Sequence, residues 1–207
     1  MYFLHYLFKN NRLRRLKLLI NKILFNNSAS YWEKRYQRNG NSGTGSRGHL
    51  ANYKADVIND FIKQKNIQSL IEFGCGDGHQ LKLINTPRYI GYDISHCAVE
   101  NCKQLFSKDG SKKFFPTSEY SNETAELVLS LYVIYHLIED DIYQNYIDLL
   151  FKASRRYVII YSSNHDENSR FNPSHIKHRR FTSDILFKYP SWELIEYIPN
   201  IFPMHRS

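Results

Sequence analysis

A glycine-rich turn with acidic neighbours is the segment of this sequence best suited to chemistry. It reads Glu72-Phe73-Gly74-Cys75-Gly76-Asp77-Gly78 and directly follows an apolar run, while Asp93 closes a second apolar run. Glycines allow a tight turn and let a ligand approach the backbone closely. A carboxylate at the end of the next strand can accept hydrogen bonds from both hydroxyls of a ribose. The segment therefore predicts a nucleoside-binding site.

The glycine spacing separates two classes of nucleotide ligand. A dinucleotide-binding turn has its third glycine three residues after the second, at the position that His79 occupies, whereas Gly78 comes two residues after Gly76. The spacing therefore argues against a pyrophosphate site. Each part also has a purely structural explanation, because the glycines can form a simple turn and Asp93 can cap a helix. The succession of strand, acid, glycine turn, helix, strand and acid favours ligand binding.

Short apolar runs alternate with helical stretches around this turn and must position it. Strands are expected at 69–73, 89–92, 113–115, 127–131 and 157–161, with a last strand near 194–198. Helices are expected at 53–65, 79–84, 98–106, 140–151 and 183–188. Strands separated by helices form parallel sheets with right-handed crossovers. The predicted fold is α/β and Rossmann-like, with a mostly parallel, doubly wound sheet and helices on both faces.

The positive charge of the chain is concentrated at its start. The formal net charge is +8 over 207 residues, and residues 1–26 hold six Lys and Arg and no acid. The rest of the chain is therefore nearly neutral and lacks the broad basic surface of a dedicated nucleic-acid binder. We do not expect nucleic acid to be the main partner.

Residues 1–26 are expected to form a basic amphipathic helical arm. Leu13, Leu16, Ile20 and Ile23 recur at helical spacing, with basic and polar residues between them. Such a helix can pack on its own domain, pack on a second subunit of a homodimer, or lie on an anionic membrane surface. These alternatives stay open at this point.

Neither a membrane span nor a disulfide framework is expected. No run approaches the roughly 20 apolar residues that a spanning helix needs, and the apolar start precedes the basic cluster, unlike a cleavable signal peptide. The three cysteines are too few for a disulfide framework and match no zinc spacing. A cytoplasmic protein without a metal is expected, with peripheral contact at the inner membrane surface as an option.

Several segments resemble class I S-adenosylmethionine-dependent methyltransferases. The run 72–78 together with Asp93 is similar to the first two motifs of that family. The chain also resembles the amino-terminal region of a small methyltransferase family in two segments, Tyr31-Trp32-Glu33-Lys34-Arg35-Tyr36 and Gly40-Asn41-Ser42-Gly43-Thr44-Gly45-Ser46. Residues 133–137 and 178–182 resemble later parts of the same family. The likeness extends over roughly residues 31–203, and the run 72–78 is its most specific part.

The resemblance implies S-adenosyl-L-methionine as the cofactor and a three-part chain. Residues 1–26 would be the arm, 27–48 a cofactor-covering linker with a glycine-rich loop, and 49–207 the Rossmann-like methyltransferase domain. Gly74 and Gly76 would shape the methionine pocket, with Glu72 at its polar end and Asp93 on the ribose. The full set implied in cofactor binding is Trp32, Glu72, Gly74, Cys75, Gly76, Gly78, Asp93, Ile94 and Ser118.

His136 is the candidate catalytic base. It follows the fourth expected strand, at the carboxyl edge where ligands bind, and histidine titrates near neutrality. It can equally pack at the start of a helix. Residues 178–180, His-Arg-Arg, suit recognition of an anionic group on an acceptor, or form a solvated face.

The acceptor of the methyl group has several candidates. A small molecule or a glycan is the leading expectation. RNA or protein methylation is an alternative within enzymes, and a non-catalytic S-adenosylmethionine-binding module is the contrasting class.

Overall fold

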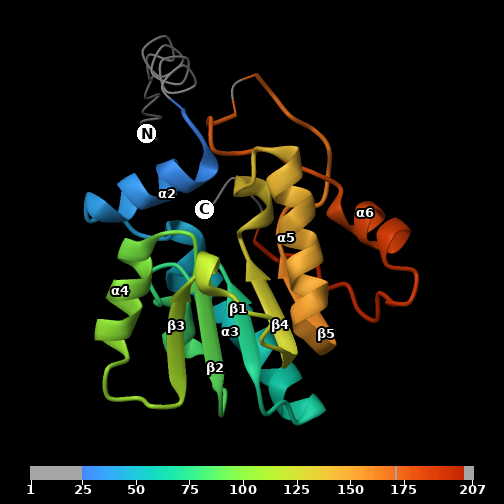
Figure 1. The fold of residues 1–207 in the computed structure, drawn as a ribbon. Coiled ribbons are helices and arrows are strands. Elements are labelled where there is room, and N and C mark those ends of the chain that lie inside the picture. The colour runs from blue at the N-terminus through green and yellow to red at the C-terminus, as the bar shows by residue number, and fades with distance from the viewer. Residues whose placement is uncertain (1–24, 171, 203–207) are drawn as a thin grey trace, which may run out of the picture.

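A five-stranded parallel sheet forms the centre of the computed structural model, which describes residues 25–170 and 172–202. The strands are β1 (Leu70–Phe73), β2 (Tyr89–Asp93), β3 (Lys112–Pro116), β4 (Ala125–Leu131) and β5 (Ser154–Tyr161). Their order is β3-β2-β1-β4-β5, and every neighbouring pair is parallel (Figure 1). The predicted α/β fold with a doubly wound sheet is confirmed. Residues 1–24 of the predicted arm lie outside the described residues.

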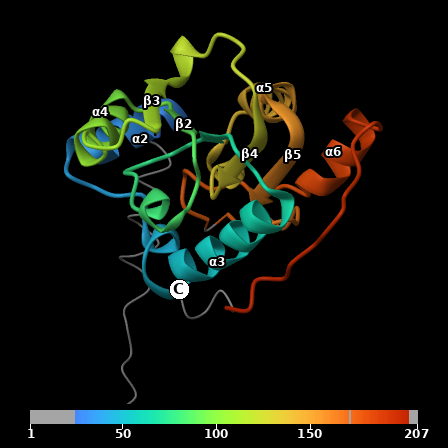
Figure 2. The same cartoon turned by 90° about the horizontal axis from the view of Figure 1, so that it is seen from below.

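Helices cover both faces of the sheet, as predicted. Helix α3 (Gly48–Lys65) and α4 (His96–Leu105) lie against one face, and α5 (Asp140–Ala153) and α6 (Phe181–Lys188) lie against the other. Figure 2 shows α3 and α5 on opposite sides of the strands. Helix α2 (Ser28–Gln37) lies beyond the end of the sheet at which β1 and β4 finish (Figure 1). In the described chain, no helix has the length and apolar character needed to cross a bilayer.

Alternating side chains along the strands build a core on each face. In β1, Leu70 joins the cluster under α3 and α4, whereas Ile71 and Phe73 join the cluster under α5. Glu72 therefore points to the α3 side, because successive strand residues face opposite ways. Each fully buried Leu, Ile or Phe side chain stabilises the fold by about 1.5–3 kcal/mol, so these two clusters hold the strand ends in place.

Helix α2 is an element that the sequence did not predict. The polar stretch near residue 27 was expected to be a linker, but the Asn27 side chain accepts a hydrogen bond from the Ser30 backbone N–H at 2.7 Å and caps the helix. The Ser28 hydroxyl donates to the His136 carbonyl at 2.8 Å. These contacts attach the start of α2 to the segment after β4.

Two predicted elements differ from the structure. The stretch 79–84 forms only a short 3₁₀ turn, Gln80–Leu83, because Asn59 of α3 bonds to Leu83 and Asn85 and pulls the chain away from a helical path. The predicted strand near 194–198 was wrong. That segment runs toward α3 instead, where Tyr53 donates to the Pro199 carbonyl at 2.9 Å. It is consequently not paired with β5.

Candidate functional site

The glycine turn lies where the strand order reverses. The chain passes from β1 outward to β2 and β3, and then returns to place β4 and β5 on the other side of β1. In open parallel sheets, a reversal of this kind creates a crevice at the carboxyl ends of the strands, where ligands bind. Residues 74–78 follow β1 and residues 132–136 follow β4, so both segments border this crevice.

Two positions in the turn accept only glycine. Gly74 has a φ of 91° and Gly76 a φ of 57°, in the region that side chains disfavour. A Cβ atom on Gly74 would lie 2.3 Å from Val133 Cγ2, and one on Gly76 would lie 2.3 Å from Ser42 Oγ. The turn is therefore packed from both sides by the segment after β4 and by the loop after α2.

Asp93 ties the second strand to this turn. Its side chain is buried and accepts hydrogen bonds from the backbone N–H of Gly76 at 2.8 Å and of Ser95 at 2.9 Å. Burial raises the pKa of Asp93 to about 6, which these two hydrogen bonds partly oppose. Each carboxylate oxygen keeps a free lone pair for a further donor.

A buried acid and a buried ammonium group face the same region. Glu72 accepts a hydrogen bond from the Tyr89 hydroxyl at 2.6 Å, and burial raises the pKa of Glu72 to about 7. Lys54 of α3 is 2% exposed, and its Nζ has no hydrogen-bond partner. That Nζ lies 4.3 Å from the centre of the Tyr132 ring, and burial lowers the pKa of Lys54 to about 8. The nearby charge of Glu72 and the Tyr132 ring offset part of the cost of burying this ammonium group, but its N–H donors are left without acceptors.

Sequence reasoning missed Lys54. The signal was present, because Lys54 lies four residues after Leu50 and four before Ile58, and all three occupy the buried face of α3. A lysine at a position of an amphipathic helix that is otherwise occupied by apolar residues predicts a buried charge. Only the packing of α3 against β1 places that charge beside Glu72.

The loop after α2 covers the crevice. We call residues 39–47 the strap. Its Ser42 donates its backbone N–H to Asp77 Oδ2 at 3.2 Å, while the Ser42 hydroxyl accepts the Asp77 N–H at 3.0 Å. Arg47 also bonds to Asp77, at 2.7 Å. At the other end, a Cβ on Gly45 would lie 2.5 Å from the Tyr132 ring, so the strap reaches from the turn after β1 to the segment after β4.

His136 is a neutral imidazole in an aromatic cluster. Its Nδ1 lies 2.8 Å from the His175 carbonyl, which can only accept, so Nδ1 carries the proton and Nε2 is left with a lone pair. The ring meets Trp32 edge-on at 4.8 Å and stacks on His175 at 5.3 Å. Burial lowers the pKa of His136 to about 3. Trp32 thus borders the crevice from α2.

The other predicted residues take different positions. The Cys75 side chain is buried in the core under α3 and α4, so only its backbone faces the turn. Gly78 packs against Cys102 of α4: a Cβ atom added to Gly78 would lie 3.0 Å from Cys102 Sγ. Ile94 is 52% exposed. Ser118 is exposed and follows β3, whose last residue Pro116 pairs with Asp93 of β2, so it lies at the same carboxyl edge of the sheet as the glycine turn.

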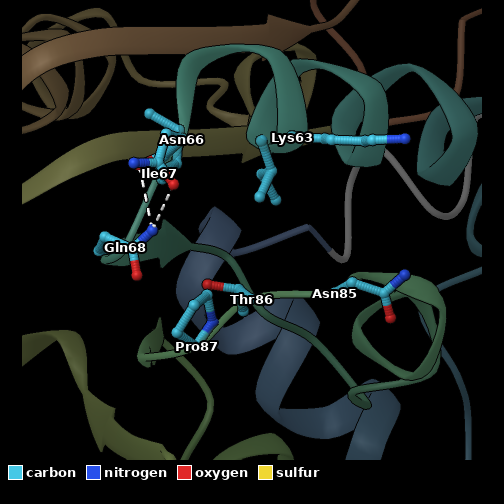
Figure 3. Close-up of a pocket in the computed structure, with 8 residues that line it drawn as sticks. Lys63, Asn66, Ile67, Gln68, Asn85, Thr86 and Pro87 are labelled. Atoms are coloured by element: carbon cyan, nitrogen blue, oxygen red, sulfur yellow. Dashed lines mark hydrogen bonds between the residues drawn. The ribbon is translucent and has the colours of Figure 1, made fainter.

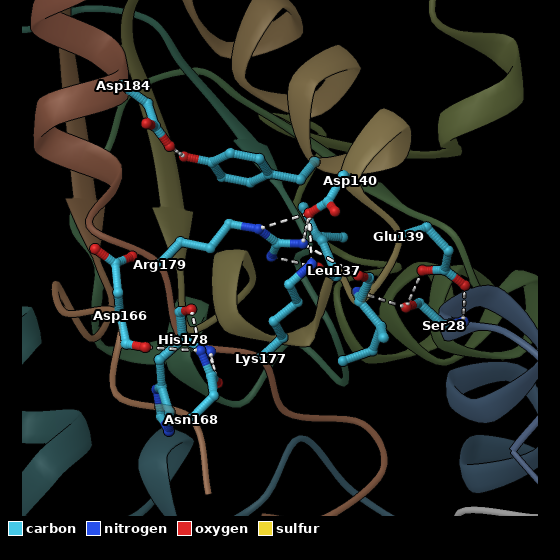
Figure 4. A network of polar contacts seen from close by, with 12 residues as sticks. Ser28, Leu137, Glu139, Asp140, Asp166, Asn168, Lys177, His178, Arg179 and Asp184 are labelled. Atoms are coloured by element: carbon cyan, nitrogen blue, oxygen red, sulfur yellow. Dashed lines mark hydrogen bonds and ion pairs between the residues drawn. The ribbon is translucent and has the colours of Figure 1, made fainter.

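Two side chains of the basic run 178–180 make contacts with different parts of the chain (Figure 4). Arg179 is buried and bonds to the carbonyl of Ile138 at 3.1 Å and to Asp140 at 2.8 Å, which anchors this segment to the start of α5. His178 points the other way and lies 2.6 Å from the Ser163 hydroxyl. Arg179 is therefore engaged in structural contacts.

A pocket of about 440 Å³ lies at the opposite edge of the sheet (Figure 3). Lys63, Asn66, Gln68 and Thr86 are among its lining residues, from the last turn of α3 and the loops that precede β1 and β2. Parallel strands bind ligands at their carboxyl edge, so this pocket is separate from the candidate site. Over the described ranges, no three metal-ligating side chains gather in one place.

Solved structures with this fold are methyltransferases. The N-methyltransferase NodS from Bradyrhizobium japonicum WM9 in complex with S-adenosyl-L-homocysteine is similar over 79% of this chain and 86% of its own, with a TM-score of 0.61 and 16% identity. The methyltransferase domain of bacterial CtHen1-C is similar over 68% and 85%, with a TM-score of 0.53 and 21% identity. No protein-family model matches the sequence, and no curated protein matches it. The likeness establishes the class I methyltransferase fold.

Proposed function

We propose that this protein is an S-adenosylmethionine-dependent methyltransferase that acts on a small-molecule or glycan acceptor. One observation carries the proposal: at the switch point of this fold, the glycine turn has a buried carboxylate bonded to its backbone and a buried, unpartnered ammonium group nearby. These groups are Asp93 and Lys54. NodS, which has the same fold, was solved with S-adenosyl-L-homocysteine.

The charges of the site match this cofactor. Its methionine part carries an ammonium and a carboxylate, for which Glu72 and Lys54 offer opposite charges, and Asp93 offers acceptors to the ribose hydroxyls. Gly74 and Gly76, both at positive φ, let the ligand approach the backbone of the turn. A dinucleotide would instead bring the negative charges of a pyrophosphate toward two buried acids, Glu72 and Asp93.

The chain needs few reactive groups for this chemistry. The cofactor supplies a methyl group on a sulfonium that is already a good leaving group. The protein aligns the acceptor with that methyl and excludes water, tasks that suit the strap and α2 above the crevice. For a hydroxyl acceptor, Nε2 of His136 has the lone pair that would take the proton, because Nδ1–H is donated to the His175 carbonyl, but the pKa of about 3 makes this imidazole a weak base.

Neutral rings near His136 favour an uncharged acceptor. Tyr31 stacks on His175 with ring centres 4.3 Å apart, and His165 lies 4.5 Å from His178. Burial lowers the pKa of both His175, to about 4, and His178. Flat, uncharged rings with polar edges suit small organic rings and sugars better than phosphodiesters, which attract cations. RNA or protein methylation and a non-catalytic binding module are the alternatives that activity must exclude.

Calorimetric titration of the whole chain tests the proposal. S-adenosylmethionine and S-adenosylhomocysteine are expected to bind with micromolar affinity, with NADH as the control ligand. Absence of binding, or tighter binding of NADH, would contradict the proposed cofactor. Transfer of radiolabelled methyl to fractionated glycans and small metabolites, with RNA and protein fractions in parallel, then tests the acceptor class.

Replacing Lys54 with methionine should separate ligand binding from stability. We expect affinity for S-adenosylhomocysteine to fall about 30-fold, near 2 kcal/mol, because the ligand carboxylate loses its charged partner. The melting temperature of the free protein should stay level or rise, because an unpaired buried charge is removed. Lys63→Met, at an exposed position of the same helix, is the control and should change neither quantity. A fall in stability with unchanged affinity would make Lys54 purely structural.

Cofactor affinity should weaken in mild acid. The pKa values of Asp93 and Glu72 are raised to about 6 and about 7, so both groups take up protons between pH 7.5 and 5.5 and stop acting as anions. We expect at least a tenfold loss of S-adenosylhomocysteine affinity over this range, measured by calorimetry. Burial raises both pKa values above those of the unfolded chain. The resulting destabilisation is complete above the folded pKa and is relieved as pH falls toward the unfolded value, so these groups do not unfold the protein in this window. An affinity independent of pH would contradict their role.

A further inference from the structure

Glu33 on α2 is a partly buried carboxylate with only one of its two oxygens hydrogen-bonded. Its Oε1 accepts a hydrogen bond from Gln37 Nε2 at 3.0 Å, one helical turn further on. Its Oε2 is shielded from solvent and has no hydrogen-bond partner. An unpaired carboxylate oxygen in such surroundings is costly, so the arrangement requires an explanation.

The face of α2 that carries Glu33 lies over the glycine turn. Tyr36, three residues after Glu33, shares that face, and its hydroxyl lies 3.0 Å from Ser42 Oγ. That same Ser42 oxygen accepts the Asp77 N–H and lies 2.3 Å from the position of a Cβ on Gly76. Gly76 in turn donates to Asp93. Glu33 and Asp93 therefore border one region from the covering helix and from the sheet.

The two carboxylates act on each other through their charges. Burial is the main cause that raises the pKa of Asp93, and the negative charge of Glu33 adds to it. Arg35, two residues after Glu33 on α2, is engaged by the Asn41 carbonyl at 2.6 Å and the Tyr31 hydroxyl at 3.2 Å. Two carboxylates that repel each other, one buried and one partly buried, are stabilised by a ligand that brings two hydrogen-bond donors and no negative charge.

We infer that Glu33 is a second carboxylate ligand for the ribose of the cofactor, so that one hydroxyl of the 2′,3′-diol donates to Asp93 and the other to Glu33. This inference rests on the proposed function. A diol supplies two donors on neighbouring carbons, and a second carboxylate acting on the same region as Asp93 gives each hydroxyl its own charged acceptor. A metal ion is a poorer match, because Ca²⁺ and Mg²⁺ need more oxygen ligands than this pair provides.

The position of Glu33 also couples ligand binding to α2 and the strap, which together cover the crevice. Because Glu33 belongs to α2, a hydrogen bond from the ribose holds that helix, and with it the strap, over the crevice. The same helix carries Trp32, one of two tryptophans in the chain. We expect its fluorescence to change when the ligand holds α2 and the strap over the crevice.

A ligand-and-variant cycle tests the inference. The probes are S-adenosylhomocysteine and its 2′,3′-dideoxy analogue, titrated calorimetrically against the wild-type chain, Glu33→Gln and Glu33→Asp. For S-adenosylhomocysteine, we expect both variants to bind about tenfold more weakly, because each loses the charged acceptor or its reach. For the dideoxy analogue, the same variants should differ from wild type by less than twofold. Lys34→Gln, on the exposed side of α2, is the matched control.

The outcomes separate the two claims. If wild-type chain does not bind S-adenosylhomocysteine, the proposed function is wrong and the inference falls with it. If wild type binds but Glu33→Gln binds equally well, the inference alone is wrong. An equal loss for both probes would likewise contradict it, because the effect would then not depend on the diol. Circular dichroism and melting curves establish that each variant is folded, and Glu33→Asp serves where Glu33→Gln does not fold.

Discussion

Asp93→Ala is expected to weaken binding of S-adenosylhomocysteine at least 100-fold, or about 2.7 kcal/mol. The substitution removes the proposed acceptors for the ribose. It also leaves the backbone N–H groups of Gly76 and Ser95 without their acceptor, so the glycine turn loses the contact that holds its shape against β2. Calorimetric titration at pH 7.5, where the wild-type carboxylate is ionised, measures the loss.

His136→Ala is the matched comparison for Asp93→Ala. It removes a buried side chain from the neighbouring segment but leaves the turn and both buried acids intact. We expect its affinity for S-adenosylhomocysteine to remain within about threefold of wild type, with methyl transfer slowed by about 100-fold once an acceptor is known. Wild-type affinity in Asp93→Ala would remove the ribose-binding role of Asp93, whereas lost affinity in both variants would indicate general damage.

Gly74→Ala is expected to lower the free energy of unfolding by about 2–4 kcal/mol and to abolish cofactor binding. The backbone at Gly74 has a φ of 91°, which a side chain disfavours, and the added Cβ would meet Val133 Cγ2 at 2.3 Å. Val133 belongs to the segment after β4, so relief of this clash would push apart the two segments that border the crevice. Urea unfolding measures the first effect and calorimetry the second.

Two further variants isolate the cause. Gly110→Ala changes a glycine with no heavy atom within 4 Å of the added Cβ, and its stability should stay within about 0.5 kcal/mol of wild type. Gly74→Ala combined with Val133→Ala should recover part of the loss, because the clash is removed while the backbone strain remains. Wild-type stability in Gly74→Ala would show that the turn tolerates a side chain.

The sequence predicted best where neighbouring residues decide the structure. The glycine turn, Glu72 and Asp93 were identified because their roles depend on positions within or at the ends of two successive strands. The expected strand near 194–198 failed, because an apolar alternation can either pair with β5 or pack elsewhere, and the contact of Tyr53 with Pro199 draws the segment toward α3. Ser118 was grouped with the site by resemblance; it lies two residues after Pro116, the register partner of Asp93, and its role in cofactor binding stays a prediction.

Strand and helix alternation, the glycine turn, its acids and the near-neutral charge of the body were determined by the sequence itself, because each depends on local periodicity or composition. The tertiary structure alone decided that Lys54 is buried within electrostatic range of Glu72, that the charge of Glu33 acts on Asp93, and that Arg179 is engaged in structural contacts. Those side chains lie on helices or loops whose packing partners are distant in sequence. Whether a charge is buried, paired or left without a partner is set by that packing, which no local pattern encodes.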